Sequence, residues 1–331
     1  MIFKTQSKKM SIKGSPAQSV QVSDELDMDT LYQDALASGY NVDQAVFEYG
    51  LLKLPRNAQT GSLHILVPGI HKQGSIASFN SMTRTLMQHR FSRPTPARYI
   101  DAHGRLQVAD VDEPRLDWNV ITRLSNGYLM EQGSVNLLPT SHGHIGPHTK
   151  GFTTSKSDVL HWGKVLEKPA DCYGLNLHIG IIQAKKTYAY SAYVKIEDGI
   201  RPLKEHFCLH FGNKLIEDYS ITFLCQGIYR IQAVCCCEDL KGYNWLGLET
   251  AESSFEYGIQ ILGEQLEPAD QVSSYIPTDG NIAIRMADTL IVSQELPQAK
   301  QMLLELKDKP ASTLQALAVF EDPQYNFIQY S

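Results

Sequence analysis

The sequence lacks any apolar run long enough to cross a membrane. Its longest apolar stretches, such as residues 63–67 and 221–225, fall far below the roughly 18 residues of a membrane-spanning helix. The chain does not open with a basic segment followed by an apolar one, which is the pattern of a signal peptide. We therefore expect synthesis in a cytoplasm and no insertion into a membrane.

The sequence also lacks a strong charge of either sign. Its 36 acidic residues exceed its 30 basic residues to give a net charge of -6, and both kinds are spread evenly along the chain. Proteins that bind the phosphate backbone carry clustered Lys and Arg. This charge distribution therefore argues against a nucleic-acid partner.

Sequence motifs of catalysis are missing as well. The chain contains no GxSxG elbow, Walker loop, GxGxxG or HExxH sequence, and its scattered acids form pairs no more often than chance allows. Its six cysteines show no CxxC spacing, so zinc binding has little support. Residues 235–237 are consecutive cysteines, and neighbouring residues of a strand rarely meet disulfide geometry. We expect reduced thiols, no cofactor and no enzyme activity.

The first 90 residues combine helical and strand patterns. Residues 1–20 are polar and read as an exposed arm. Ser23 or Asp24 suits a helix cap, and the apolar residues that follow keep helical spacing until Gly39. Residues 63–67 then alternate like a strand and are followed by Pro-Gly, which is typical of a turn. We interpret residues 1–90 as a mixed α/β attachment region.

Residues 142–290 carry the pattern of a β-sandwich. Apolar and polar residues alternate with the period of two that a half-buried strand requires. No long helix separates the strands, so an antiparallel sandwich or jelly roll is favoured over a parallel α/β sheet. The alternation predicts strands over residues 187–195, 219–225, 229–235 and 257–264.

Two groups of short motifs flank this region. The first motif group comprises Arg115-Leu-Asp-Trp118, Tyr128-Leu-Met-Glu131 and Asn136-Leu-Leu138, and the second comprises Gly263-Glu-Gln-Leu-Glu267, Tyr275-Ile-Pro-Thr278 and Arg285-Met-Ala-Asp288. In order and spacing they resemble the flanks of the carbohydrate-binding-like jelly roll found in bacteriophage head-spike and tail-fibre proteins. The resemblance covers residues 91–290. Asn126-Gly127, which lies between motifs of the first group, is a hairpin signal. Gly104, which precedes the group, suits a turn.

The resemblance implies a non-enzymatic virion protein, made in the host cytoplasm and carried on the head or tail of the particle. It implies a homotrimer that contacts other virion proteins through residues 1–90 and presents the jelly roll to host-surface polysaccharide. The order of parts would be an attachment region (1–90), a β linker (91–141), the jelly roll (142–290) and a C-terminal packing element (291–331). The alternative is a structural decoration, adaptor or tail component that binds no sugar.

Glycan binding would use aromatic side chains beside amides and carboxylates, because sugar rings stack on aromatic faces and their hydroxyls need polar partners. The candidates are Trp162, Tyr243, Asn244 and Trp245. The last three follow Lys241-Gly242 in a turn-like stretch between two strands, where a scaffold can present them. An equally favoured interpretation is that Trp245 closes one end of the sandwich core.

His142, His144 and His148 lie within one glycine-bearing stretch. Three chains around a threefold axis could supply six imidazole nitrogens to an octahedral metal ion. We favour the simpler interpretation, which is a solvated polar loop leading into the sandwich.

The C-terminal region begins with a helical pattern. Pro297 suits a helix start, and the apolar residues up to Leu306 precede a stop at Pro310. This pattern predicts a short helix of about three turns.

Overall fold

The protein is described by a computed structural model covering residues 28–42, 63–66, 69–80, 85–142, 153–157, 163–168, 175–196, 202, 204–212, 214–237, 245–250, 258–291, 303–304, 311–314, 317–320 and 328–330. Its α-helix is α1 (Met28–Ala37), which confirms a helix before Gly39, and η2 (Lys204–His206) is a single 3-10 turn. All strand pairs in these ranges are antiparallel. No helix among these residues is long and apolar enough to span a membrane.

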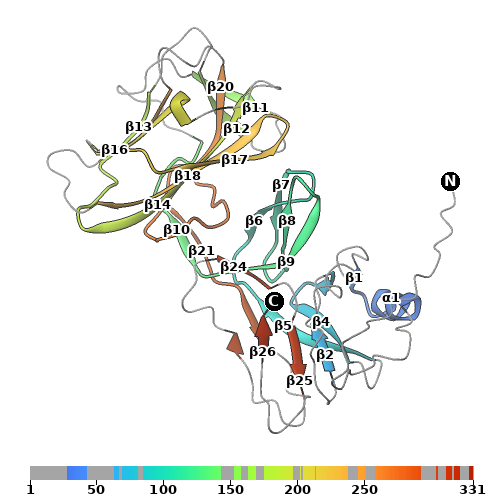
Figure 1. Ribbon diagram of the computed structural model, residues 1–331. Coiled ribbons are helices and arrows are strands. Elements are labelled where there is room, and N and C mark those ends of the chain that lie inside the picture. The colour runs from blue at the N-terminus through green and yellow to red at the C-terminus, as the bar shows by residue number, and fades with distance from the viewer. Residues whose placement is uncertain are drawn as a thin grey trace, which may run out of the picture.

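Strands that precede the sandwich and strands that follow it share one sheet. Its main strand order is β23-β22-β5-β4-β2-β25-β26, and β1 and β3 join it through β4. Figure 1 shows the blue N-terminal strands beside the red C-terminal ones, below the sandwich. The strands are β1 (Asn41–Val42), β2 (Leu63–Leu66), β3 (Ile70–Lys72), β4 (Ser75–Asn80), β5 (Thr85–Ser92), β22 (Thr289–Ile291), β23 (Leu303–Leu304), β25 (Leu317–Phe320) and β26 (Ile328–Tyr330).

The expected C-terminal helix is wrong where it can be checked. Leu303 and Leu304 form β23 and pair with Ile291 and Leu290 of β22. A short apolar run such as Met302 to Leu304 fits either a helix or a buried strand, and here the neighbouring strand decides. The rest of the expected helix lies outside the described residues.

Three small antiparallel units connect this sheet to the sandwich. They are the hairpin β6 (Ala97–Ile100) and β7 (Leu106–Ala109), the sheet β24-β9-β8 formed by β8 (Leu116–Asn119), β9 (Leu124–Glu131) and β24 (Ala311–Leu314), and the ribbon β10 (Ser134–Asn136) and β21 (Ala283–Arg285). Gly104 turns the hairpin with a φ of 77°, as expected. The hairpin expected at Asn126-Gly127 is wrong, because Gly127 lies inside β9 where its pairing with β8 shifts register, and the turn falls at Arg123.

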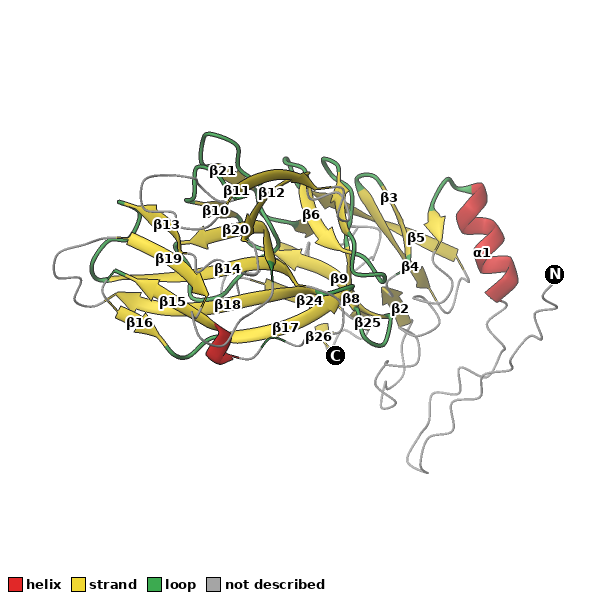
Figure 2. Cartoon of the chain, turned by 90° about the horizontal axis from the view of Figure 1, so that it is seen from above, coloured by secondary structure: helices red, strands yellow, loops and turns green. Residues whose placement is uncertain are grey.

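The sandwich consists of two sheets, as the alternation predicts. Figures 1 and 2 show it at the opposite end of the molecule from α1. The six-stranded sheet has the order β11-β12-β20-β14-β18-β17, and the four-stranded sheet has the order β13-β19-β15-β16. The strands are β11 (Thr153–Ser157), β12 (Gly163–Lys168), β13 (Leu175–Ile179), β14 (Lys186–Ile196), β15 (Phe207–Phe211), β16 (Lys214–Ile216), β17 (Ser220–Cys225), β18 (Ile228–Cys237), β19 (Trp245–Thr250) and β20 (Ile259–Glu267).

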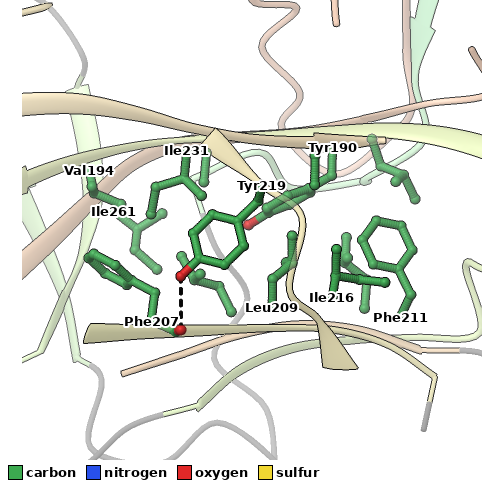
Figure 3. Packing of buried hydrophobic residues seen from close by; sticks show 14 of the residues in the cluster. Tyr190, Val194, Phe207, Leu209, Phe211, Ile216, Tyr219, Ile231 and Ile261 are labelled. Atoms are coloured by element: carbon green, nitrogen blue, oxygen red, sulfur yellow. Dashed lines mark hydrogen bonds between the residues drawn. The ribbon is translucent and has the colours of Figure 1, made fainter. Parts of the chain in front are cut away.

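The sandwich core lies between these sheets and is mostly apolar (Figure 3). Leu209 of β15 faces Ile231 and Ile261 of the other sheet, and all three are fully buried. Tyr219 spans the gap, and its hydroxyl donates to the carbonyl of Phe207 at 3.0 Å. Burying each such side chain contributes roughly 1.5–3 kcal/mol. The predicted mainly β class with an antiparallel sandwich is therefore confirmed.

Strand β14 differs from the half-buried strand that its sequence suggests. Ala189, Ser191 and Tyr193 occupy its outer face and yet are buried. The outer face is covered because Leu106 of the linker hairpin and Tyr275 pack with Tyr193. The linker therefore does not merely precede the sandwich but contacts its largest sheet.

The ribbon β10–β21 has an inverted pattern. Arg285 is buried, whereas Ile282, Ile284 and Met286 are 56%, 62% and 46% exposed. Ile284 lies in β21, and Ile282 and Met286 flank that strand at alternate positions. Val135 pairs with Ile284 and lies half-buried on the same face.

Candidate functional site

A buried cluster of five charged residues, Arg93, Arg115, Glu131, Arg285 and Asp288, joins the segment that leads into the sandwich to the segment that leaves it, and we call it the junction cluster. The Arg115 Nη2 atom lies 2.6 Å from Asp288 Oδ2 and 2.9 Å from Glu131 Oε2. Arg93 Nη1 lies 3.1 Å from Asp288 Oδ1, and Arg285 Nη2 lies 3.5 Å from Glu131 Oε2. Their side chains are almost fully removed from solvent.

The cluster holds three guanidinium groups against two carboxylates, and backbone groups complete its bonding. Arg93 donates to the carbonyls of Thr95, Asp110 and Glu113. The backbone N–H of Glu131 donates to Asp288 Oδ2 at 2.9 Å. Because each group is held by several partners at fixed angles, the cluster fixes the segment before the sandwich against the segment after it.

The electrostatics keep Glu131 and Arg115 charged. Burial opposes the ionisation of Glu131, but Arg115, Arg285 and hydrogen bonds from Ser274 outweigh it and lower its pKa below the usual value. Burial likewise opposes the charge on Arg115, but Glu131 and Asp288 raise its pKa. A buried carboxylate and guanidinium that hold each other in the charged form suit a structural connection.

The two motif groups also meet beyond the cluster. The Asn136 amide donates to the carbonyls of Ile276 at 2.8 Å and Glu264 at 3.1 Å, and its oxygen accepts from the Leu266 N–H at 3.0 Å. The Ser141 and Tyr275 hydroxyls lie 2.7 Å apart. Motifs that are more than a hundred residues apart therefore interlock through side-chain to backbone bonds.

A second buried polar group joins the two sheets of the sandwich. Glu264 of β20 accepts a hydrogen bond from the Tyr190 hydroxyl at 2.7 Å, and its other oxygen lies 3.1 Å from His178 Nε2 of β13. All three are buried. Burial first, and then the charge of Glu264, raise the pKa of Tyr190 well above its usual value. Tyr190 therefore stays a neutral donor.

The outer face of the four-stranded sheet carries a partly accessible polar pair. His210 Nε2 of β15 lies 3.1 Å from Glu249 Oε2 of β19, and both side chains are partly exposed. Burial lowers the pKa of His210, so at neutral pH its uncharged ring donates to the carboxylate. Trp245 begins β19, the strand that carries Glu249.

Of the expected site residues, Trp245 and His142 lie within the described ranges. Trp245 lies at the start of a strand, paired with Ile179. His142 ends a described range and is half-buried. The structure does not describe the remaining candidates, Trp162, Tyr243, Asn244, His144 and His148. Across the part of the chain that is described, no three metal-binding side chains gather into a site. The four cysteines whose surroundings can be described, Cys208, Cys225, Cys235 and Cys236, form no disulfide, in agreement with the expected thiols.

Sequence reasoning missed the main polar features. The motif groups contain Arg115, Glu131, Arg285 and Asp288, but nothing in their order shows that they pair. No sequence motif marks His178, His210 or Glu249. A usable signal was the position of Glu264 and Glu267 in a strand that is otherwise uncharged, because a charge in a buried strand needs a partner.

Comparison with known proteins does not assign the chain to a family. No family model matches the chain, and no curated protein matches it. Among solved structures, it is similar to the N-terminal CBM22-1–GH10 modules of endo-1,4-β-D-xylanase 10B from Clostridium thermocellum, complexed with xylohexaose. The match has a TM-score of 0.30 and 9% identity, and it covers 44% of this chain and 30% of that chain. The fold assignment therefore rests on the strands and their pairing and not on this match.

Proposed function

We propose that this chain is a non-enzymatic bacteriophage virion protein, a spike or fibre of head or tail, whose β-sandwich binds host-surface glycans. The proposal includes a homotrimer attached to other virion proteins through the N-terminal region. The observation that carries it is the junction cluster. The residues that resemble phage motifs are the same residues that fix the segment before the sandwich against the segment after it.

A rigid junction suits a protein that presents a binding module. The chain enters and leaves the sandwich through the same set of small sheets, and strands that precede and follow the sandwich share the sheet beyond them (Figure 1). An attached base and a distant module could then act without bending between them. Permanent ion pairs at fixed angles are directional in a way that apolar contact is not.

The glycan site that we propose is the outer face of the four-stranded sheet. His210 and Glu249 offer a donor–acceptor pair that is open to solvent, and sugar hydroxyls are bound by such pairs. Trp245 lies four residues before Glu249 in β19, and sugar sites usually combine an aromatic residue with a carboxylate.

The test is binding of the full chain to a glycan array and to surface polysaccharides from candidate bacterial hosts. Trp245→Ala and Glu249→Gln should each weaken binding about tenfold, which corresponds to about 1.4 kcal/mol. Glu217→Gln, at an exposed position after β16, is the matched control and should leave affinity unchanged. If Trp245→Ala lowers stability but not affinity, Trp245 closes the core instead.

A chain that binds no glycan, yet is found on phage particles by antibody labelling, would be a decoration, adaptor or tail component. Absence of label from all particles would reject the virion proposal itself. Release of reducing ends from polysaccharide by the purified chain would reject the non-enzymatic part.

A further inference from the structure

The outer face of the six-stranded sheet carries an arginine that is anchored but not neutralised. Arg230 Nη2 donates to the carbonyl of Ser273 at 2.6 Å and to the Ser191 hydroxyl at 3.3 Å. The guanidinium also lies over the ring of Tyr193, 5.1 Å from its centroid. These contacts hold the group in one place, as a freely solvated arginine is not held.

The charge of Arg230 has no direct counterion in the described part of the chain. No carboxylate there lies within ion-pair distance of it. The buried Glu267, whose charge also acts on Tyr193, is bonded to the Ser134 hydroxyl at 2.6 Å. Arg230 Nε is buried and has no hydrogen-bond partner among the described residues. The guanidinium has therefore lost hydration without gaining an anion, a loss that a bound anion would offset.

Uncharged hydrogen-bonding side chains surround this cation. Thr222 of β17 pairs with Arg230, and Ser220 pairs with Gln232. All four face away from the core, because the residues between them, such as Ile231, pack into it. We call these four residues the Arg230 patch. The patch offers one fixed cation, two hydroxyls and an amide, and it contains no acid.

The Arg230 patch lies at the border between a covered and an open part of the sheet face. On one side, Leu106 and Tyr275 pack with Tyr193 and cover it. On the other side, β17 ends the strand order of the sheet, and its Ser220 and Thr222 are exposed. A ligand can therefore reach the patch from the β17 edge.

We propose that the Arg230 patch binds an acidic sugar residue through its carboxylate. Arg230 holds the carboxylate, because a guanidinium and a carboxylate form strong charge-assisted hydrogen bonds. The side chains of Ser220, Thr222 and Gln232 bond the sugar hydroxyls, since hydroxyls and amides both donate and accept. The site lies on the opposite sheet from the glycan face proposed above and does not rest on it.

The charges of the two faces fit different ligands. The outer face of the four-stranded sheet presents the Glu249 carboxylate beside His210, which burial keeps uncharged at neutral pH. An acidic sugar would be repelled there, whereas the Arg230 patch attracts it. A peptide carboxylate would use Arg230 and leave the neighbouring hydroxyls without a role.

The first test is ligand-observed NMR titration of the full chain with glucuronic acid and N-acetylneuraminic acid, with glucose as the neutral counterpart. We expect at least one of the acids to bind about tenfold or more tightly than glucose, because the charge-assisted bond is the main contact. Binding of neither acid, or equal binding of acid and glucose, would overturn the proposal. Acetate that binds as tightly as the acidic sugar would also overturn it, in favour of a bare carboxylate such as that of a peptide.

The second test uses variants of the patch. Arg230→Gln should weaken binding of the acidic sugar about tenfold or more. Arg123→Gln, which removes an exposed cation from the β8–β9 turn, is the matched control and should leave affinity unchanged. Because Arg230→Gln also removes the bond to Ser273, Thr222→Val is the second variant. It removes one exposed hydroxyl, and it should weaken binding severalfold without changing urea stability. Unchanged affinity in either patch variant would overturn the site.

Variants of the other sheet separate this site from the proposed function. Trp245→Ala and Glu249→Gln should leave binding of the acidic sugar unchanged, whatever they do to binding on the glycan array. Acidic-sugar binding that survives there supports the Arg230 patch even if the array result rejects the glycan face. Loss of that binding in Glu249→Gln, with retention in Arg230→Gln, would place the acidic sugar on the other sheet and overturn the Arg230 patch.

Discussion

Two buried regions of this molecule are built from opposite chemistry. Between the sheets of the sandwich, Leu209, Ile231 and Ile261 pack without charge. At the junction, three arginines and two carboxylates are buried together. Apolar burial is strong but not directional, whereas ion pairs are costly to bury but fix angles. The difference indicates that the sandwich core supplies stability and that the junction supplies orientation.

The largest effect should come from removing one member of the junction. Asp288→Ala leaves Arg93 and Arg115 facing each other without their shared carboxylate. Breaking a buried pair in this way costs about 3–5 kcal/mol. Urea unfolding measures the loss, and hydrogen exchange should rise first in β8 and β9. Asp270→Ala, at an exposed position, is the control; an equal and small change in both variants would show that the cluster orders nothing.

A cavity in the sandwich core should cost slightly less and act differently. Leu209→Ala removes a fully buried side chain between the sheets, for which the usual loss is about 2–5 kcal/mol. Hydrogen exchange should rise across β14, β15 and β18 while β8 and β9 keep their protection. Leu215→Ala, on an exposed side chain of the same sheet, should change little. If both core and junction variants loosen the same strands, the two regions are one cooperative unit and the comparison fails.

Acid should weaken the junction before the sandwich. The pKa of Glu131 is lowered in the folded chain, so its stabilising effect is present above the usual carboxyl pKa and is lost as the pH falls toward the folded value. We expect exchange in β9 to accelerate below about pH 4.5, the ordinary range of a Glu. Glu131→Gln should remove most of this pH dependence, and an unchanged acid profile would contradict it.

Alkali should act in reverse and with the smallest effect. Burial first, and then Cys208, raise the pKa of Tyr219 to about 12, so its contribution is complete below the ordinary tyrosine pKa of about 10 and is lost as the pH rises through the folded value. Tyr219→Phe should cost about 1 kcal/mol and flatten stability between these values. Ultraviolet titration of the phenol measures the shift, and a normal tyrosine titration at this residue would contradict the burial of its hydroxyl.

The sequence was informative where structure depends on near neighbours. Alternation identified β14, β17, β18 and β20, because each strand buries one face against the core. It could not foresee that Tyr193 would be covered by Leu106, or that Leu303 would pair with Ile291, because these contacts depend on other parts of the chain.

The candidate site was less accessible to sequence reasoning for the same cause. Arg93 and Asp288 are 195 residues apart, and Arg115 and Asp288 are 173 apart. At Ile284-Arg285-Met286 the usual rule of apolar inside and charged outside is reversed. A periodicity argument would therefore have turned this strand the wrong way, since only the partners of Arg285 explain its orientation.

The junction cluster also limits how this molecule could be cut or recombined. Glu131 and Arg115 precede the sandwich in the chain, whereas Arg285 and Asp288 follow it. A graft that moved the sandwich alone onto another scaffold would leave behind the charged residues that precede and follow it. Successful exchange between proteins would have to carry both motif groups together with the sandwich. The segment that can be exchanged therefore begins before the sandwich and ends after it.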